Sequence, residues 1–380
     1  RICGPQNIIL HVAKRLKNYN INTIVLIPKG KGDFSKLLDK YNIKYYKMNL
    51  LKAKKTFNPI YHIKYVINLI ISIIEIRKII NQEKIDIIHA NSPWQIKGPI
   101  AGIFKNVKVL WHLNDVCLTG FYRKILVFLI NLLSDQIVNA SKAVEKHYVK
   151  KELLYKSEIL YAPIDTNYFN SKKIKKSKNK ITFKYLKNIQ FKENDAIIST
   201  VGNINPLKGY EYLIEAINIL RNKNINYNIK LLIIGSKLET QKKYLNKLKK
   251  MIEEYELNKN VFLVGKKDEI RELLYITDLY VCSSISEACP ISVLEAMSME
   301  KIIIANKVGG IPELIEDQES GLLIPPKNPD ILSNKITKVL NHKNNFKQLG
   351  INARKKAINE FSIKKIVKKH KEIYKDLYYN

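Results

Sequence analysis

The chain has few cysteines. Its 380 residues contain only Cys3, Cys117, Cys282 and Cys289. They lie far apart, without the spacing of a metal site or the pattern of a disulfide-stapled domain. Cys289 is accompanied by no histidine or acid motif that would make it a catalytic nucleophile. The composition therefore excludes a disulfide scaffold, and we expect a reducing cytoplasm as the location.

Long apolar runs are missing too. The longest, Tyr65–Ile74 and Ile125–Leu133, reach about half of the roughly twenty residues that a helix needs to span a bilayer. Apolar residues still make up 46% of the chain, which is enough for sizeable cores. The length predicts two domains of ordinary size.

Acidic residues are scarce: 34 Asp and Glu stand against 66 Lys and Arg, a net charge of +32. Residues 1–190 hold 35 basic and 11 acidic residues, a net +24. A basic half indicates an anionic partner, either nucleic acid or lipid headgroups. The alternative is compositional, because lysine far outnumbers arginine and Asn and Ile abound. Such drift accounts for much of the charge but not for its asymmetry.

Two glutamates stand eight positions apart around a predicted helix start. Proline is favoured at the first helical position, so we expect Pro290 there, with Glu287 on the loop before it and Glu295 on the helix. The free N–H groups of Ile291 and Ser292 would then attract an anion. A phosphate flanked by two carboxylates that hold hydroxyl groups describes a sugar nucleotide. The alternative is an ordinary capped helix on a sheet.

Two more motifs flank this element: Gly202–Gly209 (GNINPLKG) precedes it and Gly309–Glu313 (GGIPE) follows it. In this order the chain resembles the retaining GT-B glycosyltransferases of the group 1, or GT4, family. That family carries Gly-Arg-Leu-x-x-x-Lys-Gly, then Glu-x7-Glu, then Gly-Gly-x-x-Glu. The resemblance covers nearly the whole chain and is densest from about residue 195 to about residue 330.

The resemblance implies a GT-B fold of class α/β, with two Rossmann-like domains whose parallel sheets face a central cleft. We expect an acceptor-binding domain at 1–185, a nucleotide-sugar-binding domain at 186–345, and terminal helices at 346–380 that cross back to the first domain. A strand should precede the first helix, and we hypothesise that it is missing from this sequence. Residues 171–194 carry nine lysines and are interpreted as a solvated boundary and linker.

The resemblance also assigns roles. Glu295 should hold the ribose hydroxyls and Glu287 the donor sugar, while Lys208 stabilises charge on the leaving diphosphate. Removing one such donor commonly costs about 10²–10³ in rate. Asn203 departs from the usual arginine and supplies no charge. The implied donor-binding residues are Gly4, Gly202, Asn203, Lys208, Val264, Gly265, Glu287, Ala288, Cys289, Pro290, Ile291 and Glu295.

One implied catalytic residue lies in the first half. His112 ends a predicted strand, where the family places a histidine that faces the sugar, and it joins Glu287 and Lys208 as a catalytic candidate. The alternative is a structural histidine. Gly4 opens the first helix and resembles the glycine loop that approaches the diphosphate.

The family implies neither cofactor nor metal, and the chain has no Asp-x-Asp pair. The nucleotide sugar, with UDP or GDP as the expected carrier, is a substrate. Basic residues Lys52, Lys54, Lys55 and Lys64 beside the Tyr65–Ile74 stretch indicate an anionic membrane surface as a further partner. A glycan or lipid-linked acceptor in surface polysaccharide synthesis follows, with a cytoplasmic enzyme peripheral to the inner face of the cell membrane and no nucleic-acid partner.

Rival hypotheses remain open. A polyanion-binding protein would use the basic half and lose affinity with salt. A degenerate GT-B scaffold would fit Asn203. A sugar-nucleotide epimerase could share the fold, although the Glu-x7-Glu spacing favours transfer.

Overall fold

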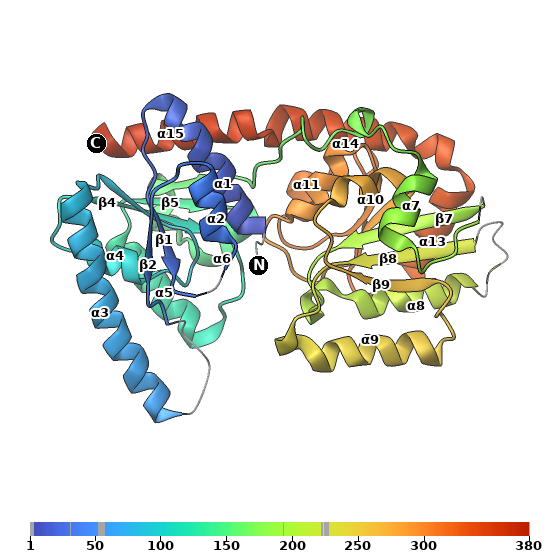
Figure 1. The fold of residues 1–380 in the computed structure, drawn as a ribbon, viewed down its shortest axis with the longest axis horizontal. Helices are drawn as coiled ribbons and strands as arrows, with labels where there is room; N and C mark the ends of the chain where they lie inside the picture. Colours follow the sequence, from blue (N-terminus) through green and yellow to red (C-terminus); the bar gives the residue numbers. More distant parts are fainter. Residues whose placement is uncertain are drawn as a thin grey trace. The chain divides into compact units, whose positions relative to one another are not determined.

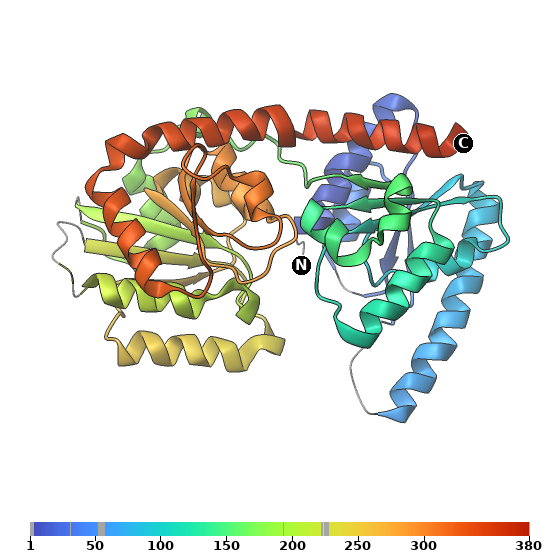
Figure 2. The same cartoon turned by 180° about the vertical axis from the view of Figure 1, so that it is seen from behind.

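The computed structural model of the chain describes residues 4–30, 32–51, 58–192, 194–221, 223 and 228–379. It divides into two compact units, Arg1–Pro163 with Ile363–Asn380, and Ile164–Ser362. Both units are α/β structures built on parallel strands (Figure 1, Figure 2).

The first unit alternates strands and helices. Its strands are β1 (Val25–Pro28), β2 (Tyr45–Met48), β3 (Ile87–Ala90), β4 (Lys108–Leu113), β5 (Gln136–Asn139) and β6 (Ser157–Ile159). Its helices are α1 (Gly4–Leu16), α2 (Phe34–Lys40), α3 (Pro59–Glu83), α4 (Lys97–Gly102), α5 (Gly120–Leu133), α6 (Lys142–Tyr148) and α15 (Ile363–Tyr379), with 3-10 turns η1 (Lys17–Tyr19) and η2 (Lys151–Lys156). The strands form a parallel pair, β1-β2, and a parallel sheet in the order β3-β4-β5-β6.

The end of the chain completes the core of this first unit. On α15, the buried Ile366 and Ile373 pack with Leu110 of β4 and Val138 of β5. A neighbouring cluster joins α15 to α1. The last helix is therefore part of the first unit, although it follows the second unit in sequence.

The second unit has one sheet with helices on both faces. Its strands are β7 (Asp195–Val201), β8 (Asn228–Ile234), β9 (Val261–Gly265), β10 (Leu279–Cys282), β11 (Ile302–Asn306) and β12 (Leu322–Ile324). Its helices are α7 (Lys178–Leu186), α8 (Tyr210–Arg221), α9 (Lys242–Glu254), α10 (Ile270–Ile276), α11 (Ile291–Ser298), α12 (Ile311–Leu314), α13 (Pro329–Asn341) and α14 (Lys343–Phe361), with 3-10 turns η3 (Ser171–Lys173), η4 (Pro206–Lys208) and η5 (Glu239–Gln241). All six strands are parallel, in the order β12-β11-β10-β7-β8-β9.

Alternate residues of the central strands point to opposite faces of this sheet. Ile198 packs in a cluster with α8, α9 and α13, whereas its neighbour Ile197 packs with α7 and α10. Figure 1 shows α8 and α9 on one side of the strands and α7 and α10 on the other. Burial on both faces explains why these strands are continuous apolar runs.

Two predictions about the domain boundary are wrong. The first unit ends at Pro163, so the boundary predicted at residue 185 lies too late in the chain. The stretch 171–194 is not a linker, because it contains α7, whose Ile181 and Leu186 are buried in the core of the second unit. The lysines line the exposed face of this short amphipathic helix, and their number obscured its apolar periodicity in the sequence. The predicted strand before the first helix stays a prediction.

Candidate functional site

The order of strands in the second unit creates a switch point. The chain moves outward from β7 through β8 to β9, then returns to the other side of β7 with β10 and continues to β11 and β12. The loops after β7 and β10 therefore start at the ends of two adjacent strands, and the chain continues from them toward opposite edges of the sheet. In open α/β sheets this is where ligands bind.

Backbone contacts hold these two loops together. The N–H of Ile285 donates to the carbonyl of Leu207 (2.8 Å), and the Ser283 hydroxyl donates to the carbonyl of Lys208 (2.9 Å). Gly209 turns the chain with φ +58°, and a Cβ there would stand 2.4 Å from the Ser283 oxygen. Only glycine fits this turn, which explains the Lys-Gly pair of the motif.

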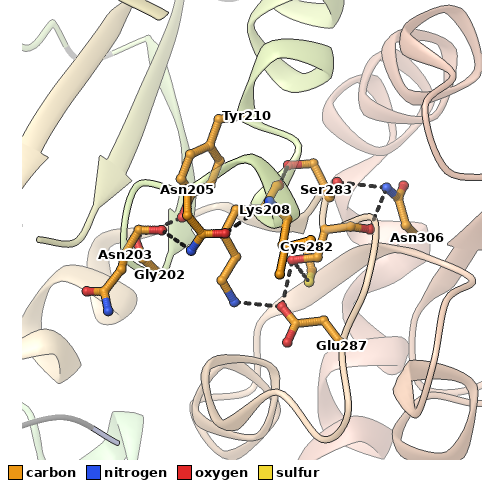
Figure 3. A network of polar contacts seen from close by, with 11 residues as sticks. Gly202, Asn203, Asn205, Lys208, Tyr210, Cys282, Ser283, Glu287 and Asn306 are labelled. Carbon is orange, nitrogen blue, oxygen red and sulfur yellow. Dashed lines mark hydrogen bonds and ion pairs between the residues drawn. The ribbon is translucent and has the colours of Figure 1, made fainter. Parts of the chain in front are cut away.

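An ion pair joins the first two motifs. Lys208 Nζ lies 2.6 Å from Glu287 Oε1, and the Ser284 hydroxyl donates to the same oxygen at 2.7 Å (Figure 3). Burial opposes the charge of Lys208, but the Glu287 carboxylate outweighs it, so the pKa of Lys208 is raised. The structure thus brings together two of the three residues predicted to be catalytic, with both side chains largely buried.

The third motif supports the backbone of Glu287. Gly309 has φ +52°, and a Cβ on it would stand 1.7 Å from the Glu287 carbonyl oxygen. The N–H of Gly310 donates to that same oxygen at 3.2 Å. The Gly-Gly pair therefore lets the turn after β11 pass directly against the loop that carries Glu287.

Helix α11 begins one residue later than predicted. Pro290 is its N-cap, with an extended ψ of 110°, and Ile291 is the first helical residue. The Pro290 carbonyl accepts from Val293 N (3.1 Å). In the described part of the chain the N–H groups of Ile291 and Ser292 have no acceptor. They remain available to an anion, as expected of a helix N-terminus.

Glu295 lies on α11, and burial raises the pKa of its carboxyl to about 8. Among the described residues its carboxyl group has neither a cation nor a hydrogen-bonding partner beside it. It is therefore a mostly buried carboxyl group whose bonding capacity is unused by the protein, which suits a ligand with hydroxyl groups.

The other predicted donor-binding residues are placed as follows. Asn203 is exposed, and Figure 3 shows it on the far side of Lys208 from Glu287. Gly202 follows β7, and its carbonyl accepts from the Tyr210 hydroxyl (2.9 Å). Val264 and Gly265 end β9, where Gly265 has φ +77°.

Ala288 and Cys289 are half-buried in the loop between Glu287 and α11. Gly4 is the first residue of α1, but its surroundings lie outside the described residues. So do the positions of Lys52, Lys54 and Lys55.

In the first unit His112 belongs to a partly buried chain of polar side chains. Burial, and then the neighbouring His370, lower the pKa of His112 to about 3, so it is neutral at physiological pH. Burial raises the pKa of Tyr374, which keeps its proton. Its hydroxyl lies 2.5 Å from His89 Nδ1, and His89 Nε2 lies 3.3 Å from His112 Nδ1.

Sequence reasoning missed three residues of the second unit. Asn306 donates from Nδ2 to the carbonyls of Ser283 (2.8 Å) and Ser284 (3.0 Å), which secures the loop after β10 (Figure 3). Ser284 bonds Glu287, and Tyr210 fixes the turn at Gly202. Asn306 could have been found, because it is the one polar residue at the end of the apolar run IIIAN.

Comparisons with known proteins indicate the family. The family described as glycosyl transferases group 1 matches residues 182–356, the segment that contains all three motifs. Over this segment the chain is similar to the group 1 glycosyltransferases. Over 320 residues the chain is 27% identical to the Escherichia coli UDP-Gal:alpha-D-GlcNAc-diphosphoundecaprenol alpha-1,3-galactosyltransferase, covering 81% of this chain and 80% of the relative.

Solved structures show the same fold as this chain. A Rickettsia africae glycosyltransferase superposes with a TM-score of 0.82 at 23% identity, over 99% of this chain and 96% of that one. An Anabaena protein, HepE, in complex with UDP-glucose gives a TM-score of 0.79 at 20% identity, over 99% and 96%. The GT-B fold predicted from the motifs is confirmed.

The described part of the enzyme contains no helix with both the length and the apolar character required to cross a bilayer.

Proposed function

We propose that this enzyme transfers a sugar from a nucleotide sugar to a glycan or lipid-linked acceptor with retention of anomeric configuration. The observation that carries the proposal is the Lys208–Glu287 ion pair at the switch point of the sheet. The same unit contains the N-terminus of α11, whose first N–H groups are free, and the Glu295 carboxyl, which no described residue bonds. Each element suits one part of a sugar nucleotide.

The proposed chemistry is charge stabilisation. As the bond from the anomeric carbon to the phosphate oxygen breaks, negative charge develops on the diphosphate. The Lys208 ammonium and the N–H groups of Ile291 and Ser292 would stabilise that charge. In retention by same-face attack, the leaving phosphate oxygen takes the proton of the acceptor hydroxyl, whose oxygen forms the new bond to the anomeric carbon.

We propose that this reaction uses neither metal nor cofactor, since Lys208 and the helix N-terminus supply positive charge. Glu295 would hold the ribose hydroxyls, and Glu287 would hold the sugar once Lys208 turns to the phosphate. The role of His112 toward the sugar stays a prediction. A neutral His112 suits a hydrogen bond to a hydroxyl group rather than proton transfer at physiological pH.

The carrier is proposed to be UDP or GDP. Support for UDP comes from the names of the similar proteins, since the Escherichia coli relative uses UDP-Gal and the Anabaena structure contains UDP-glucose. Val264 and Gly265 at the end of β9 are the proposed base-binding loop.

The acceptor is proposed to be lipid-linked, in surface polysaccharide synthesis on the cytoplasmic face of the membrane. The Escherichia coli relative acts on a sugar attached to diphosphoundecaprenol. The strong positive charge of the first half of the chain supports contact with an anionic surface.

Calorimetric titration with UDP-, GDP- and ADP-sugars in the presence of EDTA tests the donor site. We expect one nucleotide class to bind, and Glu295→Ala and Lys208→Ala each to weaken it. Lys208→Ala should also lower the transfer rate by about 10²–10³. Lys250→Ala is the matched control, because Lys250 also pairs with a glutamate, Glu254 at 3.3 Å, on the exposed surface of α9. Equal binding by all variants would contradict the proposal.

One observation favours a second candidate, a scaffold that binds donor without turning it over. Position 203 carries an exposed asparagine and no cation. If the enzyme is limited by this lost charge, Asn203→Arg should raise the rate of donor hydrolysis or transfer while Asn203→Gln leaves it unchanged. Donor binding with no turnover in either variant would identify the scaffold.

A further inference from the structure

An ordinary surface helix buries apolar residues and exposes polar ones, whereas the first half of helix α3 buries polar residues and exposes apolar ones. Its buried residues include Asn68 and Ser72, which face the protein. Asn68 donates to the carbonyl of Asn49 (2.6 Å) and accepts from the N–H of Leu51 (2.9 Å) and from Lys97 Nζ (2.6 Å). The inward face of this half of the helix is thus a polar network.

The outward face of the same helix is apolar. Seven isoleucine and valine residues are between 48% and 60% exposed: Ile60, Ile63, Val66, Ile67, Ile70, Ile71 and Ile74. Most of them follow the three-and-four spacing of one helix face. Figures 1 and 2 both draw the amino-terminal half of α3 extending beyond the sheets of the first unit. A surface helix of a globular protein exposes polar residues to water. The apolar outward face of α3 therefore suits contact with an apolar environment.

Helix α5 also exposes apolar side chains, although its buried face is apolar too. Phe121, Tyr122, Ile125, Phe128 and Leu132 are exposed, by 42% to 72%, while Leu126, Val127 and Ile130 form the buried face. Contiguous exposed apolar side chains of this size mark an interaction surface rather than scattered surface residues.

The charge of the residues beside these apolar faces indicates which partner binds them. From Asn58 to Ile74 and from Gly120 to Leu133 the sequence contains no acidic residue. The cations Lys64 and Lys124 are exposed beside the apolar side chains. On α3 the first acidic residue is Glu75, at the carboxyl-terminal end of the exposed apolar face. Aliphatic and aromatic side chains with lysines beside them complement anionic headgroups above an acyl region, as in interfacial helices.

We propose that the outward faces of α3 and α5 insert into the headgroup region of an anionic lipid bilayer, with isoleucine and phenylalanine side chains in the acyl boundary. The helices lie in the interface and do not span it. The purpose of this surface rests on the proposed function, since the surface would bring the enzyme to a lipid-linked acceptor. Its binding to lipid requires no turnover.

Cosedimentation with vesicles tests the surface. The full-length enzyme should bind vesicles of phosphatidylcholine mixed with phosphatidylglycerol more tightly than phosphatidylcholine alone. Ile63→Gln/Ile70→Gln should weaken binding about tenfold or more, because two inserted side chains become polar. The matched control is Ile351→Gln/Ile358→Gln, which changes two exposed isoleucines at the same spacing in the second unit and should bind as the unchanged enzyme does.

Two further measurements separate the possible results. Brominated lipids should quench the fluorescence of the tryptophan that Ile67→Trp introduces, but not the fluorescence of the tryptophan that Ile351→Trp introduces. Nucleotide-sugar binding by calorimetry should persist in every variant, so loss of vesicle binding is independent of the donor site.

The proposal is overturned if the unchanged enzyme ignores anionic vesicles or if the Ile63/Ile70 variant binds them equally well. It is also overturned if the surface instead drives self-association that the same variant abolishes without any vesicle binding.

Discussion

The two glutamates of the Glu-x7-Glu motif are treated in opposite ways by the fold. Glu287 is neutralised by Lys208 at 2.6 Å and bonded by Ser284. Among the described residues Glu295 has no such partner, and burial alone raises the pKa of its carboxyl to about 8. Holding an unpaired carboxylate in a mostly buried position costs stability. The protein tolerates that cost where a ligand is proposed to bind.

Glu295→Gln should therefore change the pH dependence of stability. Burial raises the folded-state pKa of Glu295 from its ordinary value of 4.5 to about 8, so its contribution to stability is fully present below 4.5 and is lost as the pH rises through about 8. Glutamine has no proton to lose. We expect the variant to gain thermal stability relative to the unchanged enzyme as the pH is raised from about 5 to about 9.

Thermal unfolding of both proteins across this range, without nucleotide, measures the effect. Glu253→Gln, at an exposed glutamate, should show no such trend. The same Glu295→Gln change should weaken nucleotide-sugar binding, because an amide replaces the carboxylate. A stability difference that does not vary with pH would contradict the expected pKa.

At the scale of elements, the site depends on turns that pass within contact distance of each other. The turn after β11 touches the loop after β10 only because Gly309 has no side chain. The turn at Gly209 approaches Ser283 in the same way. The glycines of the motifs therefore allow the loops at neighbouring strand ends to pack within contact distance of each other.

Gly309→Ala should displace the backbone of Glu287 and so reduce both stability and donor binding. The comparison variant is Gly265→Ala, which has a similar positive φ of +77° but nothing within 4 Å of an added Cβ. That variant bears only the backbone strain, of about 1–2 kcal/mol. Chemical denaturation should therefore show a larger loss for Gly309→Ala. Equal losses in the two variants would mean that the close approach to Glu287 has no energetic role.

At the scale of the whole molecule, the first unit is completed by the end of the chain. Helix α15 contributes Ile366, Val367, Ile373 and Leu377 to the cores of that unit. Its Tyr374 also begins the hydrogen-bonded chain to His112. The first unit therefore depends on a segment that follows the second unit in sequence.

Deleting residues 363–380 should destabilise the first unit and spare the second. Hydrogen exchange is the measurement: we expect amide protection to fall in β3, β4 and β5 and to persist in β7 and β8. Lys368→Ala/Glu372→Ala serves as the control, because it changes only an exposed ion pair on the same helix. Equal loss of protection in both units would show that they unfold as one cooperative body.

Local patterns in the sequence determined much of this protein. The short apolar runs at Gln136–Asn139, Leu279–Cys282 and Leu322–Ile324 form strands, because strands buried on both faces are short apolar runs between turns. The motifs also predicted Glu287 on a loop and Glu295 on a helix. Where charge outweighed periodicity, as in α7, the prediction was wrong.

Only the tertiary structure decided which residues meet. Lys208 and Glu287 are far apart in the chain, and they pair because β10 lies beside β7 in the sheet. Strand order is not encoded in any local pattern, so neither this ion pair nor the support from Asn306 could be derived from spacing. The inverted polarity of α3 was equally hidden, because an apolar helix reads the same whether its isoleucines face a core or the outside. Burial, which only the folded chain defines, separates the two.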